Sequence, residues 1–148
     1  MLMKINKQNR IIILLEILVP MVLLVLGIYH GLIQTLFRAG IIKSAEFLNL
    51  EYYQGLTLHG VINAIVLTTF FAIAFGHAVV MFYLKKGLNV FWNWVSCVLM
   101  IGGTLMAAYA ILNGSSSVLY TFYPPLKASP LFYIGVALLV VGSWIGFF

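Results

Sequence analysis

Four long apolar stretches make up most of this chain of 148 residues, and they constrain its fold more than any other feature. They run from about residue 11 to 37, 52 to 84, 90 to 112 and 130 to 148. A helix needs about 20 mostly apolar residues to cross the hydrocarbon core of a bilayer. The stretches therefore predict an all-α integral membrane protein with about four transmembrane helices, the last near the lower limit of length.

The charged residues support this fold class. They make up 7% of the chain, whereas a soluble domain carries about 25%. The net charge is +5, but the basic residues lie singly or in pairs between the apolar stretches. This pattern is typical of membrane topology rather than of a nucleic-acid-binding surface. The first apolar stretch is too long for the core of a signal peptide, so we expect a retained helix.

The lysines and arginines also predict an orientation. One side of the membrane would carry Lys4, Lys7, Arg10, Lys85 and Lys86, and the other would carry Arg38, Lys43 and Lys127. Because the more basic side is usually cytoplasmic, we expect a cytoplasmic N-terminus. The two loops at residues 38–51 and 113–129 would then lie together on the outer side.

His59 is the most unusual residue of the second apolar stretch, about two turns from its outer end. An imidazole in hydrocarbon is costly without a partner, and it is a common ligand of haem iron. Gly55 and Gly60 would allow close approach of a flat macrocycle or of another helix. Asn63, one turn further along, could bond to a buried group. The residues alone leave two alternatives open: a haem ligand, or a histidine bonded to a neighbouring helix.

Three other ionisable groups lie in apolar stretches. His30 could pair with His59 in a bis-histidine haem site, but we expect it near the headgroups, within reach of water. His77 follows His59 by 18 residues, so the two share a helix face but lie about 27 Å apart. Glu16 could relay protons. For His77 and Glu16 we instead expect side chains that reach the inner interface.

The loop at 113–129 contains Tyr120, Tyr123 and the pair Pro124 and Pro125. Tyrosine hydroxyls could hold haem propionates, or the rings could belong to an interfacial aromatic belt. The predicted topology places this loop on the same face as His59, which favours a functional role. The chain has no phosphate-binding, hydrolase or zinc motif, and we predict no catalytic residue within it.

Two segments together resemble subunit I of the haem-copper terminal oxidases, in particular the B-type branch of cytochrome c oxidases. They are Tyr53–Ala64, with the sequence YQGLTLHGVINA, and Leu119–Leu126, with the sequence LYTFYPPL, separated by one predicted helix. The resemblance implies that residues 1–148 are the N-terminal part of a larger helical bundle. It implies that His59 is an axial ligand of the low-spin haem and that the opposite ligand comes from a later helix. Tyr120 would be a neighbour of the haem propionates.

The resemblance also implies a function for the whole protein: electron transfer from cytochrome c or a similar donor to dioxygen, with proton translocation. Its setting would be a prokaryotic plasma membrane, with subunit II, other subunits and lipid as partners and no nucleic acid. The high-spin haem and copper would be held outside this chain, so we expect the fragment alone to be inactive. The alternatives are a nitric oxide reductase-like member of the superfamily, or a non-enzymatic multi-span membrane protein with a structural histidine.

Overall fold

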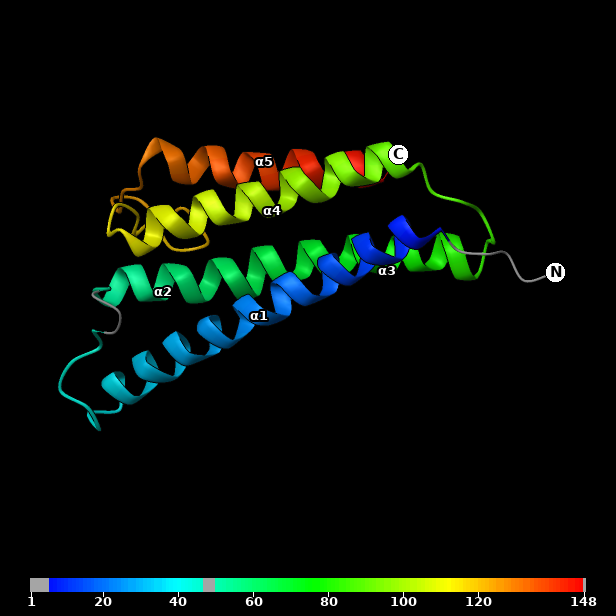
Figure 1. Ribbon diagram of the computed structural model, residues 1–148. Helices are drawn as coiled ribbons and strands as arrows, with labels where there is room; N and C mark the ends of the chain where they lie inside the picture. The colour runs from blue at the N-terminus through cyan, green and yellow to red at the C-terminus, as the bar shows by residue number, and fades with distance from the viewer. Residues whose placement is uncertain (1–5, 47–49, 148) are drawn as a thin grey trace.

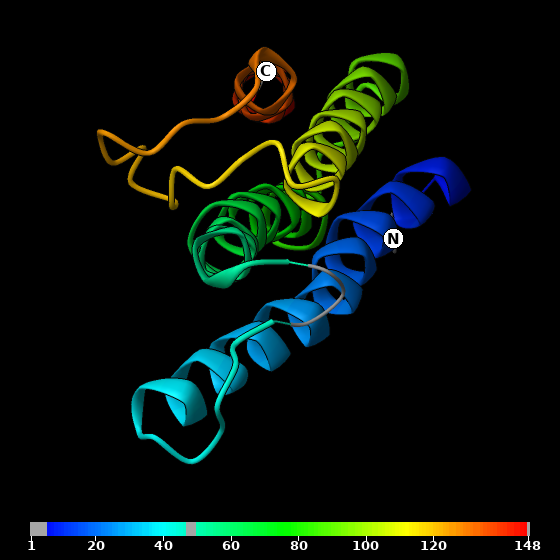
Figure 2. The same ribbon diagram turned by 90° about the vertical axis from the view of Figure 1, so that its left-hand side faces the viewer.

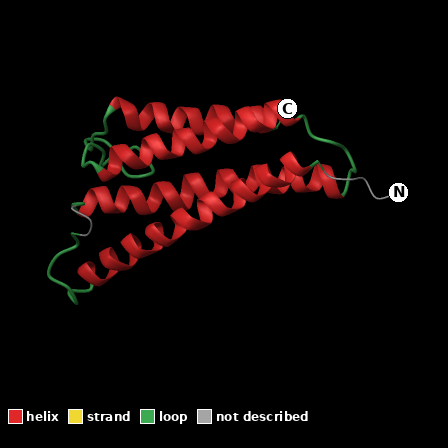
Figure 3. Cartoon of the chain, in the orientation of Figure 1, coloured by secondary structure: helices red, strands yellow, loops and turns green. Residues whose placement is uncertain are grey.

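Helices make up most of the protein in this computed structural model, which describes residues 6–46 and 50–147 (Figures 1 and 3). The helices are α1 (Lys7–Arg38), α2 (Tyr52–Gly60), α3 (Leu67–Phe82), α4 (Val90–Leu112) and α5 (Pro130–Gly146). A π-helical segment, Val61–Val66, joins α2 to α3 in one continuous apolar helix, Tyr52–Phe82. No strand forms within the described residues, so the predicted all-α class is confirmed. Lys4 and Phe148, which the sequence analysis used, lie outside the described residues.

Three of these helices are long and apolar enough to cross a membrane. They are α1 with 32 residues, the continuous helix Tyr52–Phe82 with 31 and α4 with 23. The fourth, α5, is equally apolar but has 17 residues. Large apolar side chains on the outer surface, such as Val22, Val25 and Phe75, are about 70% exposed to the surroundings (69%, 68% and 72%). Such a surface suits lipid, so the chain is an integral membrane protein.

The helix boundaries follow from local capping. Asn6 and Asn89 precede α1 and α4, and their side chains accept hydrogen bonds from backbone N–H groups two residues later, at 3.0 and 3.1 Å. These bonds satisfy donors that the first helical turn leaves without partners. Pro130 opens α5, where its missing N–H costs nothing. Pro20 lies inside α1 and is buried, so neighbouring helices shield the interrupted hydrogen bonding there.

The helices run in alternating directions, so the connections gather at two ends of the bundle (Figure 1). The residues that follow α1 and the loop at 113–129 lie at one end, which we call the loop end. The α3–α4 connection, with Lys85 and Lys86, lies at the other end together with the start of α1 and the end of α5. We call this the lysine end. The two loops that the sequence predicts to lie on one side do share an end.

The bundle is layered, with α1 and α5 on opposite sides (Figures 1 and 2). Helices α4 and α5 pack closely because Gly103 and Gly135 face each other. A Cβ atom on Gly103 would lie 2.4 Å from the Gly135 oxygen, and one on Gly135 would lie 2.6 Å from the Gly103 oxygen. Small residues at a helix crossing are typical of membrane bundles, where tight packing replaces the hydrophobic effect.

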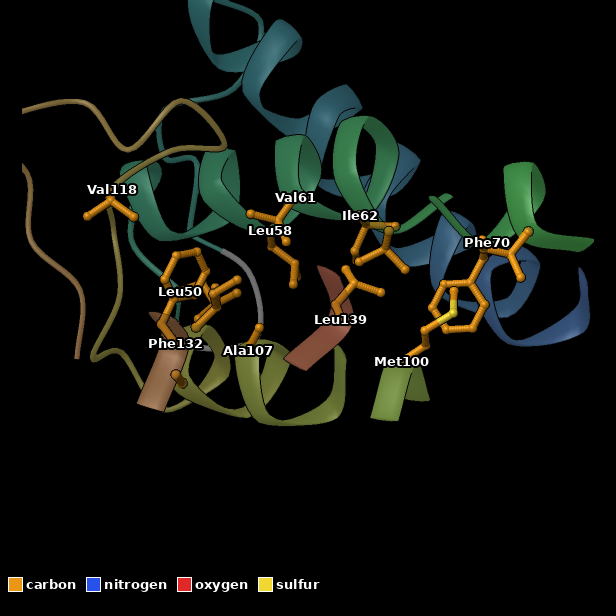
Figure 4. Close-up of a cluster of buried hydrophobic side chains, with 14 residues drawn as sticks. Leu50, Leu58, Val61, Ile62, Phe70, Met100, Ala107, Val118, Phe132 and Leu139 are labelled. Atoms are coloured by element: carbon orange, nitrogen blue, oxygen red, sulfur yellow. The ribbon is translucent and has the colours of Figure 1, made fainter. Parts of the chain in front are cut away.

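A cluster of buried apolar side chains fills the space between the continuous helix Tyr52–Phe82 and the α4–α5 pair (Figure 4). Leu58 and Ile62 come from the continuous helix, Met100 and Ala107 from α4, and Leu139 from α5. All five are at most 2% exposed. This cluster holds the two layers together. The face of α2 that carries His59 is left to contact α1.

Candidate functional site

His59 lies in the last turn of α2 and packs against α1. Its ring rests on Gly31, where a Cβ atom would lie 2.5 Å from Cε1 and 2.6 Å from Nδ1. Gly27, one turn earlier on α1, faces Asn63 and Ile62 in the same way. Two glycines four residues apart thus form a shallow seat on α1. The sequence analysis did not use this spacing, although it is a recognised signal for close helix contact.

The hydrogen bonds of His59 determine which ring nitrogen carries the proton. Nδ1 lies 2.7 Å from the Gly27 oxygen, and a carbonyl oxygen can only accept. Nδ1 therefore donates, and in the neutral ring Nε2 keeps its lone pair. As placed, Nδ2 of Asn63 lies 2.9 Å from the same Nδ1. Two donors cannot bond to each other, so the donation from Nδ1 to Gly27 requires the Asn63 amide to be turned so that its oxygen faces the ring. The sequence analysis expects Asn63 to bond to a buried group, and the group that it contacts is His59.

No residue that the structure describes forms a hydrogen bond with Nε2 of His59. The half-buried ring borders a groove of about 290 Å³ at the membrane-embedded edge of α2. The groove, which we call the His59 groove, is lined by Leu56, His59, Gly60, Asn63, Ala64, Leu119 and Tyr120. An oriented neutral imidazole beside an apolar wall with small residues fits one axial face of a haem. Among the described residues, His59 is the only histidine that lines this groove.

The π-helical segment begins directly after this site, at Val61. A π-helical turn carries one extra residue and often occurs at functional sites. Here it includes Asn63, which contacts the histidine, and Ile62, which packs against Gly27. Hydropathy and periodicity do not reveal such a local change in winding, and the sequence predicts an ordinary helix at this position.

Two polar residues of α2 attach the loop at 113–129 to the site. Gln54 donates from Nε2 to the Gly114 oxygen at 2.9 Å, and Oγ1 of the buried Thr57 accepts from the Leu119 N–H at 2.9 Å. The sequence analysis missed these roles. Their spacing could have revealed these roles. Residues three apart lie on one face of a helix, so two polar side chains at this spacing predict a polar partner on that face.

The attached loop brings Tyr120 to the His59 groove. Its ring covers Gly60, where a Cβ atom would lie 2.8 Å from Cδ1 of Tyr120. Leu119 and Phe122 on either side have φ of 63° and 53°, a conformation that costs energy for side chains other than glycine. Tyr120 is 49% exposed, and Tyr123 is 59% exposed and does not line the groove. The role of Tyr120 beside haem propionates stays a prediction.

The expectation that His30 reaches water is wrong. His30 is 1% exposed and lies in the interface between α1 and α2, where a Cβ atom on Gly55 would lie 2.9 Å from its Nδ1. Nearby, Gln34 donates from Nε2 to the Tyr52 oxygen at 3.2 Å. The absence of a side chain at Gly55 lets the two helices close over the ring, which hydropathy does not reveal.

The expectation that Glu16 and His77 reach the membrane interface is also wrong. Glu16 is 0% exposed, His77 is 4% exposed, and Nδ1 of His77 lies 3.0 Å from Oε2 of Glu16. Nε2 of His77 donates to the Gly146 oxygen of α5 at 3.0 Å. The two groups are withdrawn from the surface and pair with each other. His59 and His77 both contact α1.

The described residues contain no group of three His, Cys, Asp or Glu side chains that could hold a metal ion. Cys97 is buried and unpaired in α4.

The chain is similar to known proteins. The sequence family described as Cytochrome C and Quinol oxidase polypeptide I matches residues 11–148. The chain is 42% identical over 102 residues to cytochrome c oxidase subunit 1 of Thermus thermophilus, covering 66% of this chain and 17% of that protein.

The fold is also that of a solved structure, a heme-copper terminal oxidase dimer determined by cryo-electron microscopy. The match has a TM-score of 0.92 and 52% sequence identity, and covers 97% of this chain and 25% of that one. The chain thus spans a quarter or less of the length of these relatives. Because the family match extends over nearly all of the sequence, the chain belongs to the cytochrome c and quinol oxidase polypeptide I family of membrane oxidoreductase subunits.

Proposed function

We propose that this chain supplies one axial ligand of a low-spin haem, through Nε2 of His59. The observation that carries the proposal is the hydrogen bond from Nδ1 of His59 to the Gly27 oxygen. It holds the ring in the tautomer whose Nε2 lone pair is free for iron. Such a bond to the outer nitrogen also fixes ring orientation and raises ligand basicity.

The residues around His59 would each contribute to binding. Gly31 gives the imidazole its seat, Gly60 makes room for the Tyr120 ring, and Ala64 keeps the wall of the His59 groove low. Leu56 and Leu119 add apolar surface, which excludes water and strengthens nearby dipoles. Tyr120 would offer its hydroxyl to a propionate at the loop end. A low-spin haem held in this way supplies one-electron transfer.

For the whole protein, we propose a respiratory terminal oxidase that passes electrons from cytochrome c or a similar donor to dioxygen and translocates protons. The subunit would lie in a prokaryotic plasma membrane with its N-terminus cytoplasmic and with other subunits, including a subunit II, around it. The five basic residues predicted for one side, against three on the other, support this orientation. Family membership favours this function over a non-enzymatic membrane protein. The high-spin haem and copper would be held by residues outside this chain.

The test uses the full-length subunit purified with its partner subunits. We expect His59→Ala to abolish the low-spin haem absorbance, because no other described residue offers a free imidazole to the His59 groove. His30→Gln is the matched control in the same helix interface, and we expect it to retain that absorbance. A normal low-spin spectrum in His59→Ala contradicts the ligand assignment. Loss of the spectrum in His30→Gln would point to a pair of ligands within this chain.

A further inference from the structure

The buried pair at the lysine end has no part in the haem site. Glu16 of α1 and His77 of α3 lie at the opposite end of the bundle from the loop that carries Tyr120. They are 0% and 4% exposed, in a region that faces hydrocarbon on its outer surface. An ionisable pair is costly to bury in a membrane, so its presence calls for a physical explanation.

The hydrogen bonds of His77 allow the protons of the pair to be counted. The Gly146 oxygen can only accept, so Nε2 of His77 carries a proton. A second proton bridges Nδ1 of His77 and Oε2 of Glu16, which are 3.0 Å apart. It can reside on the nitrogen, giving imidazolium and carboxylate, or on the oxygen, giving two neutral groups. Both forms have the same total charge, so the bridging proton can shift without any charge entering or leaving.

The other carboxyl oxygen gives the pair a place for one more proton. Oε1 of Glu16 is buried and forms no hydrogen bond with any residue that the structure describes. Leaving such an acceptor without a partner is unfavourable, and water or a proton would relieve it. Binding one proton at Oε1 turns the carboxylate beside the imidazolium into a carboxylic acid. The charge of the pair then rises from zero to +1, and no electrons move.

Water can approach the His77 side of the pair from the lysine end. A hollow of about 360 Å³ borders His77 there, and its lining includes the polar residues Lys86, Asn89 and Asn93. Lys86 is exposed at the end of the bundle. Cys97 of α4 is a titratable group that is buried and lies within electrostatic range of Glu16. Helix α5 contributes the Gly146 carbonyl.

We propose that Glu16 and His77 form a proton-exchanging site, which takes up a proton from water in this hollow and releases it again. The carboxyl group of Glu16 is the group that gains and loses the proton. His77 holds the bridging proton. It also stabilises the ionised form of Glu16, so the carboxyl group does not stay protonated permanently. The proposal does not depend on His59 as a haem ligand, because the two sites share no residue.

The test is infrared spectroscopy of the complete purified complex during a pH titration, in H₂O and in D₂O. We expect the wild type to gain a carboxylic-acid band as the pH falls, and this band to shift in D₂O. Glu16→Gln should lack the band. The glutamine amide can still donate to Nδ1 of a neutral His77, so the contact persists while the exchangeable carboxyl proton is gone. The low-spin haem spectrum, or circular dichroism if the complex holds no haem, verifies that the variant is folded.

A second variant keeps the proposal testable if Glu16→Gln fails to assemble. His77→Gln removes the imidazole that accommodates a charged Glu16, so we expect a carboxylic-acid band that no longer changes with pH. A titrating band that is identical in the wild type and in His77→Gln overturns the proposal. The proposal is also overturned if the wild type shows no titrating carboxylic-acid band, or if its band persists in Glu16→Gln. A band that does not shift in D₂O overturns it as well.

Discussion

His59 and His77 lie on one continuous helix and both contact α1, yet their rings are held in different ways. At His59 one nitrogen donates to the Gly27 carbonyl, and the described residues leave the other without a hydrogen bond. At His77 both nitrogens are occupied, by the Glu16 carboxyl group and by the Gly146 carbonyl. His59 borders a groove lined largely by small and apolar residues, whereas His77 is 4% exposed and borders a hollow whose lining includes Lys86, Asn89 and Asn93.

This difference shows that hydrogen bonding, rather than residue type or depth, determines what a membrane histidine can do. A ring with one nitrogen oriented and the other free is prepared for a metal. A ring with two acceptors must carry two protons or share one, which suits proton chemistry. The neighbours on α1 make the distinction, with glycine carbonyl at one site and carboxylate at the other.

The largest expected effect comes from filling the seat of His59. In Gly31→Ala the new Cβ atom would meet the ring at 2.5 Å from Cε1, so the ring must move and its bond to the Gly27 oxygen breaks. We expect most of the low-spin haem absorbance to be lost from the purified complex. Gly102→Ala is the control, because nothing lies within 4 Å of a Cβ atom at that position. Normal haem content in Gly31→Ala would show that this seat is unnecessary.

The second prediction concerns the loss of His77 as the partner of Glu16. His77→Leu leaves the Glu16 carboxyl group buried without its partner, and removing one member of a buried pair costs about 3–5 kcal/mol. We expect a clearly lower thermal unfolding temperature of the complex, with the low-spin spectrum unchanged before unfolding. The double variant Glu16→Leu/His77→Leu should recover much of the loss, because no unpaired polar group remains. Equal destabilisation in the single and double variants would contradict pairing.

The third prediction concerns the attachment of the loop. Thr57→Val removes the acceptor for the Leu119 N–H, and an unsatisfied buried donor costs about 1–3 kcal/mol. We expect faster tryptic cleavage at the exposed Lys127 and a modest fall in unfolding temperature. Thr68→Val is the control, since Thr68 makes the same type of bond to its own helix but holds no loop. Equal cleavage rates in the two variants would argue against this role of Thr57.

The smallest expected effect tests Tyr120. Tyr120→Phe keeps the ring against Gly60 but removes the hydroxyl group. If that hydroxyl donates to a propionate, its loss leaves more negative charge near the haem and lowers the midpoint potential slightly. Spectroelectrochemical titration of the low-spin haem measures this. Tyr123→Phe, outside the His59 groove, should leave the potential unchanged, and a shift equal to that of Tyr120→Phe would contradict a specific contact.

The parts of this site that could be predicted from sequence are those that depend on local patterns. Apolar runs indicate membrane helices, and Asn113 to Ser117 indicates a loop. A histidine between glycines marks His59, and topology places the tyrosine loop at the same end. Gln54 and Thr57, by contrast, were assigned no partner, because their partners lie about 60 residues away along the chain.

By itself, the sequence determined the all-α membrane class and the approximate helix positions and singled out His59 as a candidate haem ligand, because hydropathy and residue chemistry act over short stretches. The tertiary structure decided which atoms meet. It placed the Gly27 carbonyl on Nδ1 of His59, closed α2 over His30 and joined Glu16 to His77. Those contacts depend on the rotation and depth of each helix against its neighbours. A single helix sequence contains neither quantity, because both are set by how complete helices pack.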